Sequence, residues 1–76
     1  MGGKVYKIIE LVGTSSESWE EAAAVAVGTA AKTLRDLRIA EVTEMDLQID
    51  PETGKVISYR VKLKVSFKYQ GEKYTQ

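Results

Sequence analysis

The stretch that decides the fold is VISYRVKLKVSFKY, residues 56–69, because from Ile57 onward its apolar and polar side chains alternate strictly. The odd positions are apolar and comprise Ile57, Tyr59, Val61, Leu63, Val65, Phe67 and Tyr69. The even positions are polar or basic and comprise Ser58, Arg60, Lys62, Lys64, Ser66 and Lys68. A period of two residues predicts a β-strand with one buried face and one polar, basic face.

A second strand is predicted directly upstream, over residues 39–50 (IAEVTEMDLQID). The segment DPETGK at 50–55 separates the two strands and is typical of a turn, with proline early and glycine late. The segment lacks the ligand spacing of an EF-hand loop. Together these residues predict a long β-hairpin.

The alternation also predicts the register of this hairpin, because the apolar residues of both strands must share one face. On that face the expected pairs are Ile49 with Ile57, Leu47 with Tyr59, and Met45 with Val61. On the other face the same register pairs Asp46 with Arg60, and Glu44 with Lys62. An acidic row is therefore expected beside a basic row.

Residues 4–12 (KVYKIIELV) are rich in β-branched and aromatic side chains and predict a first strand that ends at Gly13. This strand is apolar on both faces, so we expect both faces to be covered. The segment TSSES at 14–18 follows and offers two alternative capping boxes, Thr14 with Glu17 or Ser18 with Glu21. The sequence does not show which of the two capping boxes begins the next element.

That element is an amphipathic helix, because apolar residues recur at steps of three and four. Its stripe comprises Trp19, Ala22, Ala23, Ala26, Val27, Ala30, Leu34 and Leu37. We expect Trp19 to be a core or interface residue. The predicted fold is α+β with the order β-α-β-β, a three-stranded antiparallel sheet wrapped around one helix. One domain is expected over residues 1–76, with a core at 3–69 and a polar tail at 70–76.

Composition excludes several classes of protein. The 76 residues include no cysteine and no histidine, and the 11 basic side chains equal the 11 acidic ones. Disulfides, Cys/His metal sites and general nucleic-acid binding are therefore disfavoured. We see no membrane span, signal peptide or nucleophile motif, so a cytoplasmic protein that is not an enzyme is the expectation.

Size argues for assembly. A 14-residue strand spans about 45 Å, whereas a compact chain of this length is about 30 Å across. The hairpin should therefore project from the globule, and its projecting part suits a contact between subunits. We expect an obligate homo-oligomer.

The chain resembles the dodecin family. The resemblance rests on KVYKIIELVGTS at 4–15, SWEEAAAVAVGTAAKTLRDL at 18–37, and YRVKLKVSFK at 59–68. It implies a hollow homododecamer of sheets wrapped around helices, which binds flavin for storage and performs no chemistry. Flavin-binding members sandwich the flavin between a tryptophan and a glutamine, at positions that align with Ile39 and Arg60 here. Ile39 offers no aromatic platform, and Arg60 is expected to be held by Asp46.

The segments SWE, RIAEV and EMDLQID are more similar to the calcium dodecin subgroup. Calcium needs oxygen ligands, and the candidates on one strand face are Glu44, Asp46 and Asp50. The alternative interpretation is that these carboxylates only pair with Lys62 and Arg60. The first hypothesis is therefore a non-enzymatic cage that holds a small ligand or ion, with calcium ranked ahead of FMN or riboflavin. A flavin-storing dodecin and a purely structural scaffold are the alternatives.

Overall fold

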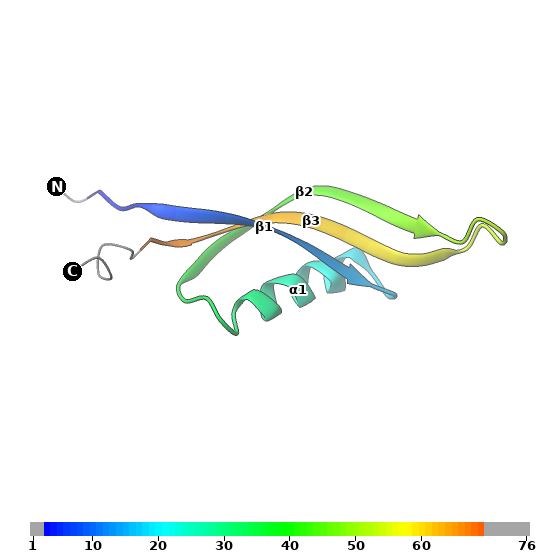
Figure 1. Cartoon of the computed structure of the whole chain (residues 1–76), viewed down its shortest axis with the longest axis horizontal. Helices are drawn as coiled ribbons and strands as arrows, with labels where there is room; N and C mark the ends of the chain where they lie inside the picture. Colours follow the sequence, from blue (N-terminus) through cyan, green and yellow to red (C-terminus); the bar gives the residue numbers. More distant parts are fainter. Residues whose placement is uncertain (1–2, 70–76) are drawn as a thin grey trace.

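The computed structural model describes residues 3–69, which form one helix and three strands (Figure 1). In chain order these elements are β1 (Tyr6–Ser15), α1 (Trp19–Ala30), β2 (Leu37–Ile49) and β3 (Val56–Lys68). The strands form one antiparallel sheet in the order β1-β3-β2, and α1 packs against one face. The predicted β-α-β-β arrangement is confirmed. The predicted polar tail at 70–76 lies outside the described residues.

The core lies between α1 and the central strand β3. Its buried apolar residues are Ala22, Ala26 and Ala30 from the helix and Val61, Leu63 and Val65 from β3. The small helix residues allow α1 to approach the sheet closely. The approach is closest at Gly13 in β1, where a Cβ would lie 2.1 Å from the carbonyl oxygen of Ala22. Strand β1 runs to Ser15, two residues beyond the end at Gly13 that the sequence predicted.

The helix begins at the second of the two predicted caps. Ser18 is the N-cap, and its Oγ accepts a hydrogen bond from the backbone N–H of Glu21 at 3.0 Å. The carboxylate of Glu21 accepts from the Oγ of Ser15, which in turn accepts from the backbone N–H of Glu17 at 2.8 Å. The turn from strand to helix is thus held by serine hydroxyls.

The helix ends earlier than its apolar stripe predicted. It stops at Ala30, so Leu34 lies in the following loop and Leu37 begins β2. Asp36 adopts a left-handed conformation with φ of 61°, and its carbonyl accepts a hydrogen bond from the backbone N–H of Lys68. Pairing with β3 thus fixes where the chain reverses, which helical periodicity does not reveal.

The hairpin register is confirmed over most of its length. Leu47 pairs with Tyr59, Met45 with Val61, Asp46 with Arg60, and Glu44 with Lys62. The predicted pair Ile49–Ile57 is wrong, because a register shift after Gln48 places Ile49 opposite Val56. Two further shifts, at Leu37–Ile39 and at Val42–Glu44, interrupt the ladder nearer the start of β2. Bulges of this kind bend a strand and increase its twist.

The described chain is elongated. Its radius of gyration is 16.0 Å, whereas a compact domain of this length would have about 11 Å. Its longest axis is 57 Å, and the β2–β3 hairpin projects past α1 (Figure 1). On β1, the described residues 3–69 do not cover both faces as predicted. Tyr6, Ile8 and Val12 point away from the helix and stay about half exposed.

Candidate functional site

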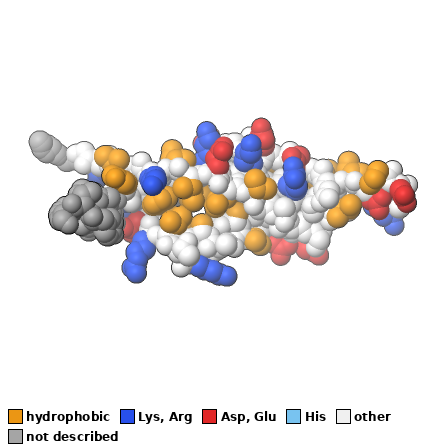
Figure 2. Space-filling view, in the orientation of Figure 1, with side chains coloured by type: hydrophobic (Ala, Val, Ile, Leu, Met, Phe, Trp, Pro, Cys, Tyr) orange, Lys and Arg blue, Asp and Glu red, His pale blue; other side chains and the backbone are white. Residues whose placement is uncertain are grey.

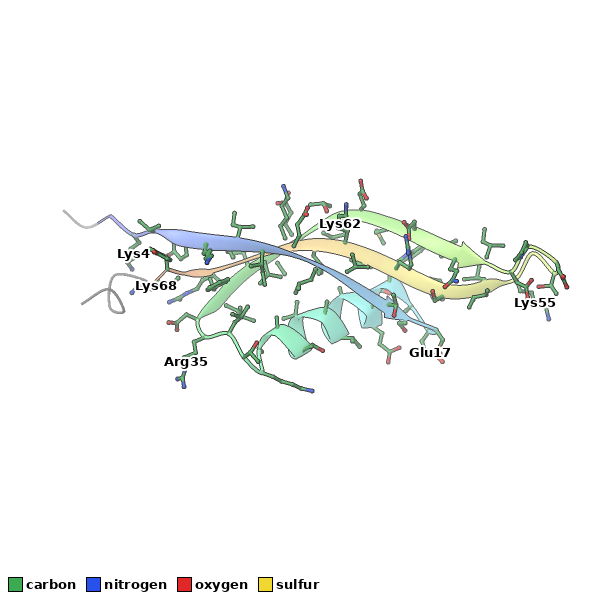
Figure 3. The ribbon with its side chains drawn as sticks, in the orientation of Figure 1. Lys4, Glu17, Arg35, Lys55, Lys62 and Lys68 are labelled. Atoms are coloured by element: carbon green, nitrogen blue, oxygen red, sulfur yellow. The ribbon has the colours of Figure 1, made fainter. Side chains whose placement is uncertain are left out.

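The sheet face opposite α1, called the outer face below, carries charged side chains in cross-strand rows. One row runs Thr14–Arg60–Asp46 across the three strands, and the next runs Val12–Lys62–Glu44. Figure 3 shows Lys62 projecting from this face, away from the helix. The two predicted carboxylates Glu44 and Asp46 therefore lie side by side on β2, each opposite a cation of β3.

Asp46 and Arg60 form a two-pronged ion pair. The Nε of Arg60 donates to one carboxylate oxygen at 2.7 Å and the Nη2 donates to the other at 3.0 Å. These hydrogen bonds hold the pKa of Asp46 below its ordinary value and raise the pKa of Arg60. About half of each side chain is exposed. The predicted pairing is confirmed, and Arg60 is aligned for its partner rather than for stacking on a ring.

The neighbouring pair is looser and leaves a carboxylate available. The Nζ of Lys62 lies 3.6 Å from Glu44, whose side chain is 68% exposed. Both pairs border a hollow of about 140 Å³. Its lining residues are Val12, Glu44, Asp46, Arg60, Val61 and Lys62. Two carboxylates and two cations thus share one shallow depression that could hold an ion or a small polar ligand.

The remaining predicted site residues lie elsewhere. Ile39 pairs with Ser66 and is 68% exposed, but it does not line the hollow. Asp50 closes the hairpin turn, where its Oδ1 accepts from the backbone N–H of Glu52 at 2.9 Å. Within residues 3–69, no group of three or more His, Cys, Asp or Glu side chains lies close enough to hold a metal ion. A calcium site that uses Glu44, Asp46 and Asp50 together is therefore not formed within one described chain.

Two residues that line or support the hollow were not predicted from the sequence. Val12 lines it from β1, since β1 pairs with the far edge of β3. Trp19 supports it from behind: its Nε1–H donates to the backbone carbonyl of Asp46 at 3.3 Å. The indole also meets the ring of Tyr59 edge-on, with centroids 5.3 Å apart. The strand order needed for both contacts is not encoded in local periodicity.

The comparison with protein families matches the dodecin model over residues 5–70, nearly the whole chain. The chain belongs to the dodecin family. The calcium dodecin of Mycobacterium tuberculosis is 53% identical over 64 residues, which cover 84% of this chain and 87% of the relative. The dodecin of Thermus thermophilus is 48% identical over 68 residues, which cover 90% of this chain and 96% of the relative.

Solved structures agree with this assignment. The dodecin from Streptomyces coelicolor superimposes with a TM-score of 0.84 at 37% identity, covering 92% of this chain and 97% of its own. The structure of the M. tuberculosis calcium dodecin, described as calcium chelating, gives a TM-score of 0.76 at 50% identity, covering 87% of this chain and 91% of its own. None of these relatives is named as an enzyme. In the described part of this dodecin, no helix is long and apolar enough to cross a bilayer.

Proposed function

We propose that this dodecin is a non-enzymatic, self-assembling shell that binds a small ligand, with calcium as the first candidate. The observation that carries the proposal is the imbalance between buried and exposed apolar side chains. In the described chain six apolar residues are buried, and three of these are alanines. Thirteen larger apolar side chains are exposed by 37–68%. A chain this small needs further burial for stability, and assembly supplies it.

The outer-face hollow supports a cation as the ligand. Glu44 and Asp46 offer carboxylate oxygens there, and hard cations such as Ca²⁺ prefer oxygen ligands. Calcium takes about six to eight such ligands, more than these two side chains provide. Water or a second copy of the chain would complete the shell. Calcium would also compete with Arg60 for Asp46, so Glu44, held only at 3.6 Å by Lys62, is the carboxylate more available to it.

Light scattering coupled to gel filtration tests the assembly. We expect a single species several times heavier than the 8.4 kDa chain, and the family resemblance implies twelve copies. A species of 8.4 kDa at micromolar concentration would reject the shell.

Thermal unfolding in calcium and in chelator tests the ligand. Because a ligand that binds only the folded state stabilises it, Tm should rise with millimolar calcium and fall back with chelator. Glu44→Gln should remove this rise. Glu41→Gln is the matched control, because Glu41 also lies on the outer face of β2 but does not line the hollow. Equal responses in both variants, or none in the wild type, would reject the calcium assignment.

Flavin is the second candidate ligand, and the family resemblance favours it. Ile39 stands where the resemblance implies an aromatic platform, and an aliphatic side chain does not stack on a flavin ring. We therefore expect no quenching of riboflavin fluorescence at micromolar protein. Quenching that Arg60→Ala reduces would restore flavin as the ligand.

A further inference from the structure

The outer-face hollow carries a balanced set of charges. Its lining includes two carboxylates, Glu44 and Asp46, and two cations, Arg60 and Lys62, and the remaining lining residues are uncharged valines. Figure 2 shows acidic and basic side chains interleaved on the side of the molecule opposite α1. The formal charge of the hollow is therefore zero. A free cation gains little from such a site, because the two resident cations offset the attraction of the two carboxylates.

The two ion pairs of the hollow are unequal. Arg60 holds both carboxylate oxygens of Asp46 through hydrogen bonds of 2.7 and 3.0 Å, and a two-pronged pair of this kind is strong and directional. The Nζ of Lys62 lies 3.6 Å from Glu44, beyond hydrogen-bond length, so charge attraction alone holds this pair. A cation that enters the hollow therefore meets least resistance at Glu44.

The side chain of Lys62 can leave this position without disturbing the sheet. It is 42% exposed, points away from the helix (Figure 3), and has a flexible aliphatic stem. The backbone is held separately, because the carbonyl of Lys62 accepts a hydrogen bond from the Oγ1 of Thr43 at 3.2 Å. Arg60 and Lys64, the neighbouring cations on the same face of β3, repel the ammonium. The side chain can thus swing into solvent while the strand stays in place.

We propose that Lys62 is a tethered counter-ion that a metal ion must displace from Glu44, so that this lysine sets the affinity of the hollow for calcium. The inference rests on the proposed calcium function and adds the residue that tunes it. With the ammonium in solvent, the other three charged side chains leave a net negative charge in the hollow. Calcium then binds to Glu44, while Asp46 keeps Arg60 as its partner. The affinity of the wild-type protein reflects calcium binding offset by displacement of the lysine.

A purely structural role for Lys62 makes a different prediction. If the Lys62–Glu44 pair served only to hold β2 against β3, its removal would loosen the hairpin and weaken calcium binding. A displaced counter-ion predicts the opposite, because removal of the ammonium leaves Glu44 without a competitor for calcium. The direction of the change in affinity therefore distinguishes the two roles.

Calcium titration by isothermal calorimetry tests the proposal with two substitutions that act in opposite directions. Lys62→Gln removes the charge and should bind calcium about tenfold more tightly than the wild type. Lys62→Arg keeps the charge and offers a planar fork that can hold both oxygens of Glu44, so it should bind calcium more weakly. Circular dichroism and light scattering check that both variants fold and assemble as the wild type does.

Lys64→Gln is the matched control, because it removes the same charge from the next cross-strand row. Lys64 lies opposite Glu41 on the outer face and does not line the hollow. At about 0.15 M salt its field in the hollow is screened, so calcium affinity should change by less than about threefold. Equal affinities of the two glutamine variants, or tighter binding by Lys62→Arg than by Lys62→Gln, would overturn the role of Lys62 while the calcium proposal stands. No binding by the wild type or by any variant would reject both proposals.

Discussion

The strands on either side of β3 meet very different surroundings, although both pair with β3 along nearly their whole length. On one side, β1 lies against the helix, and its Gly13 and Ser15 are buried. On the other side, β2 has only Leu37 partly buried among its 13 residues. The β1 side is therefore stabilised within the chain, whereas the hairpin would be covered only by the assembly that we propose. Substitutions on the β1 side should mainly lower the stability of the single chain, whereas substitutions in the hairpin should mainly weaken the assembly.

The largest expected effect is on the β1 side. Gly13→Ala places a Cβ 2.1 Å from the backbone oxygen of Ala22, so the helix must move away from the sheet. We expect a loss of about 3 kcal/mol or more in the free energy of unfolding, measured by urea denaturation. Gly28→Ala is the control, because a Cβ there meets nothing within 4 Å; in a helix it should stabilise by about 0.5–1 kcal/mol. Equal stabilities would mean that the close approach is not needed.

A pair of identical substitutions sharpens the comparison. Leu63 is 1% exposed and Leu47 is 37% exposed. Leu63→Ala should cost about 2–5 kcal/mol of unfolding free energy while the assembled mass at high concentration is retained. Leu47→Ala should cost less in unfolding but raise the concentration at which the assembly dissociates, since in the proposed assembly a neighbouring copy covers Leu47. Sedimentation over a dilution series distinguishes the two effects. If Leu63→Ala weakened the assembly and Leu47→Ala lowered the unfolding free energy more, the roles given to the two regions would be wrong.

The smallest effect is expected from the exposed ion pair on the hairpin. Because Arg60 lowers the pKa of Asp46 below 3.8 in the folded state, the pair stabilises the fold above that pH. The contribution is lost as pH falls through the lowered pKa. Thermal unfolding between pH 7 and pH 2.5 should show a slightly weaker acid dependence in Asp46→Asn than in the wild type. A steeper dependence in the variant would contradict the ion pair.

Much of the candidate site could be predicted from the alternation of apolar and polar residues along the strands. Strict alternation in residues 57–69 was enough to place Asp46 opposite Arg60 and Glu44 opposite Lys62, because a slip of one residue would expose every apolar side chain. The expectation for Asp50 depended on the same alternation, but the turn uses its carboxylate to hold Glu52. A calcium site that uses all three carboxylates together stays a prediction from the sequence.

The sequence by itself determined the strands and the hairpin register around Asp46, because these follow from side-chain periodicity along each segment. Its resemblance to known sequences indicated the family. Only the tertiary structure decided where α1 ends, since Leu34 and Leu37 continue the helical spacing while the chain must reverse at Asp36 to pair with β3. It also decided that Val12 and Trp19 support the outer-face hollow. Both depend on strand order and on helix–sheet contact, which bring together residues far apart in the chain.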